Sequence, residues 1–199
     1  MTRIAGGRCQ SRTMLILAEG PSEVRYFERF RGLNRHLAIV PIAAKRHDTK
    51  NLITYCKARV YERGIDFCNG DSVSIVIDVD NHSLSELMEV EKQYSKNGFT
   101  LYLSNRSFEC WLIMHFHDLT KPMSQEELED ELTCCIDNKY RKSEGINRCI
   151  KEEDVKSAIN RAIKKIPSEI GCNSKCGCNN PSTTVHFLVM KIMSEVSKK

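Results

Sequence analysis

Three acidic residues of this 199-residue chain follow two strand-like segments, where they could hold a metal ion. Glu19 comes directly after the apolar run 15–18, and Asp78 and Asp80 follow the run 73–77. Residues two apart on an extended chain point the same way, so the two aspartates face one position. Close carboxylates repel each other unless a proton or cation lies between them, and Mg²⁺ prefers oxygen ligands. The pattern predicts a site for Mg²⁺, or for Mn²⁺ in its place, formed by these three acids.

A local explanation competes for Glu19. Gly20 and Pro21 suit a tight turn into a helix, and Ser22 and Glu23 carry polar groups that can bind the free amides of its first turn. On this fragment alone, Glu19 is equally well explained as a solvated residue at a strand-to-helix junction. The aspartate pair, 59 residues later, favours the metal site, because ligands of open α/β sheets bind at the carboxyl ends of the strands.

Apolar periodicity predicts a regular alternation of strands and helices around these acids. Strands are expected over the segments 15–18, 37–42, 73–77 and 99–105. Helices with one apolar face are expected between them, over 23–30, 49–64 and 84–94. Successive parallel strands need crossover connections, so the chain is predicted to be an α/β protein with a mostly parallel, Rossmann-like sheet flanked by helices.

From residue 108 onward the pattern is typical of helices alone. Apolar or amphipathic helices are expected over 108–117, 124–133 and 152–166, and from about Val185. Ser124 and Glu127 have the spacing of a capping box, which predicts that a helix begins there. The chain is thus divided into a basic N-terminal arm (1–12), an α/β core (13–107) and a helical C-terminal region (108–199) packed on that core.

Composition indicates a globular cytoplasmic protein. Hydrophobic residues make up 41% of the chain, enough for one domain with a full core. No stretch approaches the roughly 18 apolar residues of a membrane span, and the N-terminus lacks the apolar core of a signal peptide. Seven of the ten cysteines are scattered through helix-like and strand-like segments, which favours reduced thiols over disulfides. No membrane partner is expected, and a homo-oligomer is compatible with the sequence.

Basic residues are concentrated in the first third of the chain, which holds 13 Lys or Arg against 5 acids up to residue 63. Such an excess favours a polyanionic partner, because cations that neutralise phosphates release counterions. Arg106 follows the fourth strand at the expected site edge, and Lys139 and Lys142 lie close to Tyr140. These three cations are candidates for nucleic-acid binding. Tyr140 could stack on a base, although a half-buried ring between solvated neighbours is the commoner outcome.

Two further groups of residues have both a functional and a structural explanation. Glu109 could be a fourth acid, for a second metal ion or as an orienting base, or it could balance the dipole of the helix that starts there. Cys172, Cys176 and Cys178 lie near His186, a combination that zinc would accept. Their spacing lacks the paired C-x-x-C of zinc ribbons. We therefore expect a flexible loop, with the histidine packed or capping, and assign no zinc.

Three segments of the chain resemble a known family. The order of strand, Glu–Gly, helix and a later strand ending in Asp-x-Asp is similar to the Toprim domain of topoisomerases, primases and OLD-type nucleases. "EGPSEVRYF" (19–27), "SNRSFECWLIMHF" (104–116) and "NPSTTVHFLV" (180–189) look like the signatures of the RloB-like family, a Toprim branch from prokaryotic restriction and phage-defence loci. The segments occur in the family's order and span nearly the whole chain. The family usually has Asn-Pro before Phe-Glu-x-Trp, whereas here Asn105 is followed by Arg106 and Ser107.

The resemblance implies a Toprim-like core and a metal-dependent nuclease, or nuclease-like effector, in phage defence. It also implies a partner ATPase of the ABC or AAA type, encoded nearby. In the Toprim pattern the Glu and both Asp residues surround magnesium, which here implies Glu19, Asp78 and Asp80. The aspartates would hold the ion, and Glu19 would complete the site or act as general acid or base, with Glu109 as a further catalytic candidate. By analogy with related Toprim effectors, RNA such as tRNA is slightly favoured over DNA.

Two other function classes fit some of the same residues. A haloacid-dehalogenase-type phosphatase would use Asp78 as nucleophile and Ser104 at the end of the fourth strand. It would leave Glu19 without a role and needs a further acidic pair downstream. A non-catalytic subunit would bind nucleic acid or nucleotide and dock to a defence ATPase, because an acidic pocket is not sufficient for cleavage. Phosphate release from small phosphoesters favours the first, and tight RNA binding without cleavage favours the second.

Overall fold

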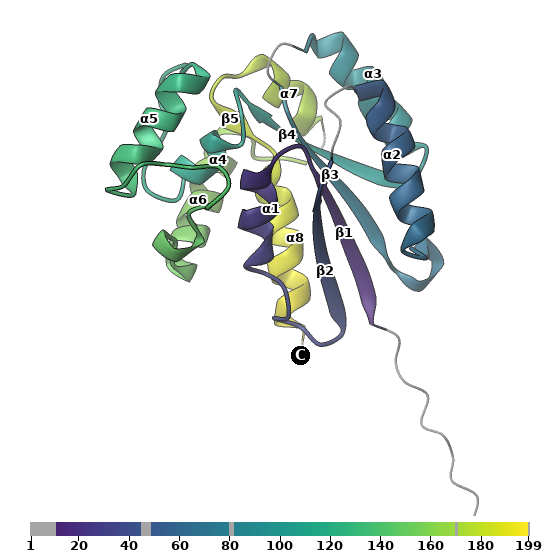
Figure 1. Cartoon of the computed structure of the whole chain (residues 1–199). Coiled ribbons are helices and arrows are strands. Elements are labelled where there is room, and N and C mark those ends of the chain that lie inside the picture. The colour runs from purple at the N-terminus through teal and green to yellow at the C-terminus, as the bar shows by residue number, and fades with distance from the viewer. Residues whose placement is uncertain (1–10, 45–48, 80–81, 170, 199) are drawn as a thin grey trace, which may run out of the picture.

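A five-stranded sheet forms the centre of the protein (Figure 1). The computed structural model describes residues 11–44, 49–79, 82–169 and 171–198. The strands lie in the order β2-β1-β3-β4-β5, and their bounds are β1 Arg12–Ala18, β2 Leu37–Ala43, β3 Ser72–Asp78, β4 Phe99–Asn105 and β5 Ser182–Thr183. The first four strands are parallel, and β5 is antiparallel to β4. The carboxyl ends of β1, β3 and β4 therefore lie at one edge.

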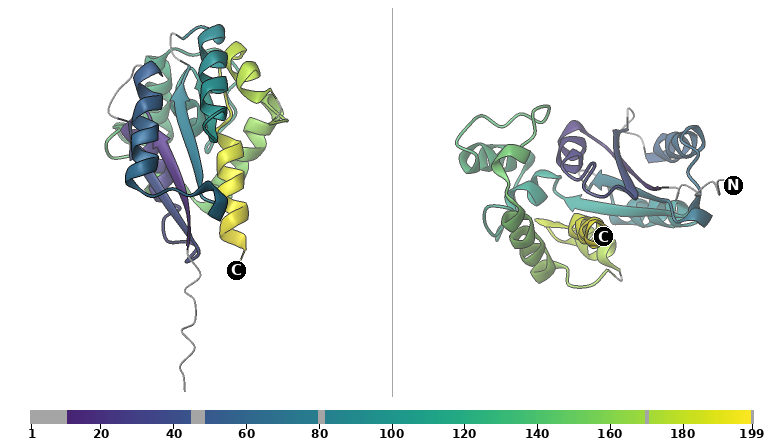
Figure 2. Two further views of the ribbon diagram at one scale, coloured as in Figure 1. Left: turned by 90° about the vertical axis from the view of Figure 1, so that its right-hand side faces the viewer. Right: turned by 90° about the horizontal axis from the view of Figure 1, so that it is seen from below.

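Helices cover both faces of this sheet (Figure 2). The core on one side includes residues of α1 (Pro21–Glu28), α4 (Glu109–Ile113), α5 (Gln125–Cys135), α6 (Glu152–Lys165) and α8 (Val185–Ser197). The core on the other side includes residues of α2 (Thr49–Glu62), α3 (Leu84–Ser95) and α7 (Cys172–Cys178). Two 3₁₀ turns, η1 (Phe67–Asn69) and η2 (Asn147–Cys149), lie in the connections. Among the described residues, no helix combines the length and apolar character needed to cross a membrane.

The central strands are buried on both sides, because successive side chains of a strand point to opposite faces. On β1, Met14 and Ile16 belong to the core with α1 and α8, whereas Leu15 and Leu17 belong to the core with α2 and α3. All four side chains are at most 2% exposed. Near-continuous apolar strands are typical of parallel sheets with both faces covered.

The structure confirms the predicted α/β fold, a mostly parallel sheet flanked by helices with a further helix at the C-terminus. Two local predictions in the C-terminal region were wrong. The helix expected over 108–117 ends as α4 at Ile113, and turns follow it. The expected loop of cysteines is helix α7, because its last carbonyls are satisfied from β4: Asn105 Nδ2 donates to the carbonyl oxygens of Cys176 at 2.9 Å and Gly177 at 3.2 Å.

The C-terminal region completes the sheet as well as covering it. In β5, Thr183 pairs with Ser104 and Ser182 pairs with Asn105. The predicted capping box at the start of α5 is present, since Ser124 and Glu127 exchange side-chain-to-backbone hydrogen bonds. Residues 1–10, most of the expected basic arm, lie outside the described residues.

Candidate metal centre

Glu19 and Asp78 lie at neighbouring strand ends. Ala18 pairs with Val76 in the sheet register, so Glu19 leaves β1 beside the last residues of β3. The Asp78 backbone N–H donates to Glu19 Oε2 at 3.2 Å. Asp80 lies outside the described residues. The structure therefore places two of the three predicted acids, and it brings these two together.

Glu23, which the sequence analysis treated only as a helix-capping residue, is a third described acid at this edge. It lies in the first turn of α1 and is 3% exposed. Its pKa is raised from 4.5 to about 7, chiefly by burial, with the charges of Glu109 and Glu19 adding to the effect and a hydrogen bond to its own backbone opposing it. The segment Glu-Gly-Pro-Ser-Glu could have indicated this position for Glu23. A helix that directly follows a strand begins over the edge where that strand ends, so an acid in its first turn lies near that edge.

Gly20 makes room for the Glu23 carboxylate. A Cβ atom at position 20 would lie 3.0 Å from Glu23 Oε2, so a larger residue would displace the carboxylate. The φ angle of Gly20 is −128°, which any residue adopts, so the missing side chain is what matters here. The expected capping is present only in part: the Glu23 carboxylate accepts from its own backbone N–H, whereas Ser22 Oγ lies 2.7 Å from the hydroxyl oxygen of Tyr140.

Glu109, in the first turn of α4, is 1% exposed and faces four donors. Its Oε2 accepts from Ser107 Oγ at 2.7 Å and from Gln125 Nε2 at 3.2 Å. Its Oε1 accepts from the Tyr140 hydroxyl at 2.9 Å and lies 3.6 Å from Lys142 Nζ. A carboxylate offers about four lone-pair positions, so these groups fix its orientation. Direct coordination of a metal by Glu109 would require one of them to leave.

Tyr140 is buried in the acidic site, and Lys142, whose side chain is 43% exposed, reaches into it from the surface. The Tyr140 hydroxyl donates to Glu109, so Ser22 Oγ must donate to Tyr140 in turn. The ring of Tyr140 is 7% exposed, more buried than the half-exposed ring that we expected. Lys142 Nζ also lies 3.0 Å from Glu129 Oε1. Burial lowers the pKa of Lys142, but the carboxylates of Glu109 and Glu129 outweigh it, so the pKa is raised overall.

The site as a whole has more negative than positive charge. Electrostatic interactions connect four carboxylates and one ammonium within the described part of the chain: Glu19, Glu23, Asp78, Glu109 and Lys142. No three of these described carboxylates have oxygen atoms that all lie within 4.8 Å of one another. Mg²⁺ usually retains several waters, so a site of this width suits an ion that some of the acids bind through water.

A basic pocket of about 680 Å³ adjoins the acidic site. Its lining between α1 and the segment 136–149 includes four cations, Arg25, Lys139, Arg141 and Arg148. Arg25 and Arg141 form ion pairs with acidic neighbours. Lys139 and Arg148 have no ion-pair partner among the residues that the structure describes. Arg106, directly after β4, is partly exposed.

The cysteine-rich segment is packed as core. Cys178 is exposed, and the other two cysteines of α7 are buried. The ring nitrogens of His186 lie 3.0 Å from the Thr183 carbonyl oxygen and 3.1 Å from that of Ile166. Burial lowers the pKa of His186 to about 4, so the ring is neutral at pH 7 and only one nitrogen donates. No three of the four potential zinc ligands noted in the sequence have ligand atoms within 4.8 Å of one another.

Comparison with known proteins gives one match. The model of the family described as RloB-like protein matches residues 14–192. No curated protein and no solved structure matches the chain. The matched range contains four strands in full, β1 from Met14 onward, and every residue of the acidic site named above.

Proposed function

Since this chain belongs to the RloB-like family, we propose that it is a magnesium-dependent nuclease that acts as an effector in phage defence. One observation carries the proposal: Glu19 meets Asp78 at adjacent strand ends, beside the buried Glu23 with its pKa raised to about 7. The buried Glu23 carboxylate, with the charges of Glu109 and Glu19 close to it, destabilises the fold when ionised unless a cation binds nearby. Perturbed carboxyl groups at the ligand-binding edge of an α/β sheet favour a functional site.

The residues at this edge fit a hard divalent cation. All the charged groups at this edge that can bind a metal are carboxylates, whose oxygen atoms suit Mg²⁺ or Mn²⁺. We assign the binding of Mg²⁺, directly or through water, to Glu19, Asp78 and Asp80. When bound, the ion would neutralise charge on the phosphate whose ester bond is cleaved.

Proton transfer is the second requirement of phosphodiester cleavage. Glu19 was the first candidate for general acid or base, and Glu23 is now another, because its pKa of about 7 in the metal-free protein is near the working pH. Glu109 is better suited to positioning. Its carboxylate holds Tyr140 and the Lys142 ammonium beside the acids, where the ammonium can attract a phosphate.

RNA, with tRNA as a candidate, is the substrate that we propose ahead of DNA. The basic pocket joins the acidic site through the segment 139–142, because Lys139 lines the pocket while Lys142 contacts Glu109. A strand with one phosphate at the metal could extend across Lys139 and Arg148, and each neutralised phosphate would contribute to affinity by counterion release. Arg106 directly follows β4, at the same carboxyl-terminal edge of the sheet. An ABC-type or AAA-type ATPase is the proposed partner.

The experiment is incubation of the purified chain with total RNA and plasmid DNA in Mg²⁺ or Mn²⁺, with and without the neighbouring ATPase. We expect metal-dependent RNA cleavage that disappears in Asp80→Ala and in Asp78→Asn. Asp130→Asn, which changes an exposed acid on α5, is the matched control. The proposal would be overturned if Asp80→Ala cleaved RNA as fast as the wild-type protein. Circular dichroism identical to that of the wild type would show that the variant is folded.

The non-catalytic subunit remains the second candidate function. The observation in its favour is that Glu109 already has four donors around it, so it needs no cation for compensation. Tight RNA binding and co-purification with the ATPase, without cleavage in either metal, would select this function. The phosphatase is disfavoured, because the Ser104 hydroxyl is fully buried and lies 3.0 Å from Thr183 Oγ1 inside the sheet.

A further inference from the structure

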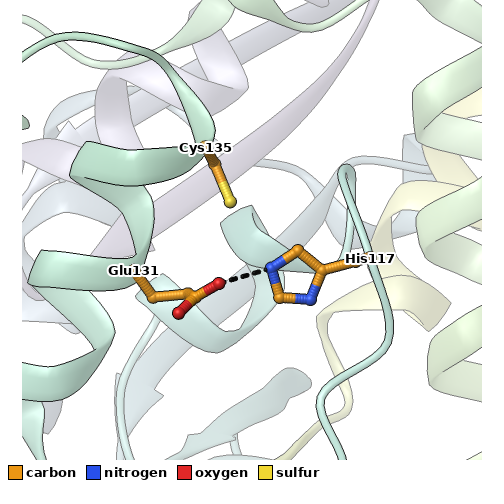
Figure 3. Close-up of side chains that lie close together, drawn as sticks. All are labelled: His117, Glu131 and Cys135. Atoms are coloured by element: carbon orange, nitrogen blue, oxygen red, sulfur yellow. Dashed lines mark ion pairs between the residues drawn. The ribbon is translucent and has the colours of Figure 1, made fainter.

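A second group of potential metal ligands lies on α5 and on the segment after α4 (Figure 3). Glu131 and Cys135 are four residues apart on α5, so they occupy one face of that helix. His117, in the segment after α4, points toward both of them (Figure 3). One ligand atom from each residue lies within 4.8 Å of the other two, the only such trio among the described residues. Imidazole, carboxylate and thiolate are the three side-chain groups that bind zinc.

The histidine is oriented as a metal ligand. Its Nδ1 lies 3.1 Å from the carbonyl oxygen of Asp118, and because a carbonyl can only accept, Nδ1 must carry the proton. Metal-bound histidines commonly donate their second nitrogen to a backbone carbonyl in this way. The remaining nitrogen, Nε2, faces Glu131 Oε1 at 2.8 Å. A lone pair on Nε2 would repel that oxygen, so either a second proton or a metal cation must lie between them.

The geometry allows a metal cation in that position. Zinc–ligand distances of about 2.0–2.3 Å put tetrahedral ligands roughly 3.3–3.7 Å apart. Small side-chain rotations that open the His117–Glu131 pair from 2.8 Å and turn Cys135 toward it would fit one ion. The side chains of His117 and Glu131 are 43% and 38% exposed, which lets them rotate and lets an ion enter from solution. Three protein ligands leave a fourth position for water.

We propose that His117, Glu131 and Cys135 form a zinc site that ties the segment after α4 to α5. The site is separate from the acidic edge in chemistry, since a thiolate and an imidazole select zinc whereas all-carboxylate sites select magnesium. The segment that carries His117 follows α4, which begins with Glu109, and α5 carries Gln125, which donates to Glu109. Zinc at this position would therefore stabilise the wall of the acidic site without taking part in its chemistry.

The test measures metal binding by the full-length chain after removal of metals with a chelator. Co²⁺, as a spectroscopic probe for zinc, should give the charge-transfer absorption of a cobalt–thiolate bond. Cys135→Ser should abolish this absorption, and Cys134→Ser, at the exposed neighbour on the same helix, should retain it. His117→Ala and Glu131→Gln should each weaken zinc binding at least about tenfold, measured by competition with a chelating dye in excess Mg²⁺.

Thermal melting gives an independent readout. Zinc should raise the Tm of the wild-type protein and of Cys134→Ser, but not that of Cys135→Ser, because only a ligand that binds the native state stabilises it. An unchanged cobalt spectrum in Cys135→Ser would overturn the proposal, and so would a wild-type protein that retains no zinc on gel filtration. Neither measurement uses nuclease activity, so the zinc site and the nuclease can fail separately.

Discussion

The acidic edge of the sheet and helix α7 both collect groups that can bind metals, with opposite outcomes. At the edge, Glu19, Glu23 and Asp78 come from separate elements and interact through space. In α7, three cysteines lie within seven residues, yet two are buried in the core and the third is exposed. Proximity in sequence does not bring the ligand atoms of these three cysteines together. The fixed register of parallel strands brings acids from different segments together, because it aligns the ends of the strands at one edge.

The two regions also differ in how their buried titratable groups are compensated. Glu23 is close to other carboxylates, and its raised pKa shows that its charge is unfavourable where it lies. His186 is neutral, and one of its ring nitrogens donates to a backbone carbonyl. A bound cation would compensate the unfavourable charge of Glu23, whereas the neutral ring of His186 needs no cation. Three substitutions test this difference.

Glu19→Gln should have the largest effect. It keeps the shape of the side chain but removes one of the charges assigned to Mg²⁺, so we expect RNA cleavage to fall by about 10³-fold. The matched control is Glu126→Gln, at an exposed position on α5, which should retain wild-type cleavage. Wild-type cleavage by Glu19→Gln would show that the edge is not the metal centre.

Glu23→Gln should stabilise the metal-free protein by about 3 kcal/mol at pH 8. The folded pKa of Glu23 is about 7 and its unfolded value is near 4.5, so the carboxyl group favours the folded state at low pH and penalises it increasingly as the pH rises from 4.5 to 7. Urea denaturation with a chelator present measures the gain. It should shrink at pH 5 and also when Mg²⁺ is added, and a gain that is independent of pH would contradict the assignment.

His186→Gln should change the acid sensitivity of the fold. The folded pKa of His186 is about 4 and the unfolded value is near 6.5, so the unfolded chain binds more protons and stability falls as the pH drops from 6.5 to 4. Between pH 7 and pH 5 the wild-type protein should lose about 2 kcal/mol more than His186→Gln. His36→Gln, at an exposed position, is the control. Equal losses in all three proteins would show that His186 is not buried in its neutral form.

Local polarity was enough to predict most of the elements and two of the acids that meet. Apolar runs bounded by turn residues gave the four parallel strands, and Glu19 and Asp78 could be placed because they directly follow such runs. Glu23 could not be distinguished from an ordinary helix-capping acid. Its burial depends on the approach of Glu109 and Tyr140, which belong to elements far along the chain.

The α/β order of elements and the acids at the strand ends were determined by the sequence itself, because hydrophobic periodicity and turn chemistry act within a few residues. Tertiary structure alone decided three other features: the helical state of α7, the buried charge of Glu23, and the meeting of His117 with Glu131 and Cys135. Each depends on contacts between distant segments. Asn105 must reach the end of α7, and the segment after α4 must pack beside α5. The distances and desolvation that fix these states exist only after the elements have packed together.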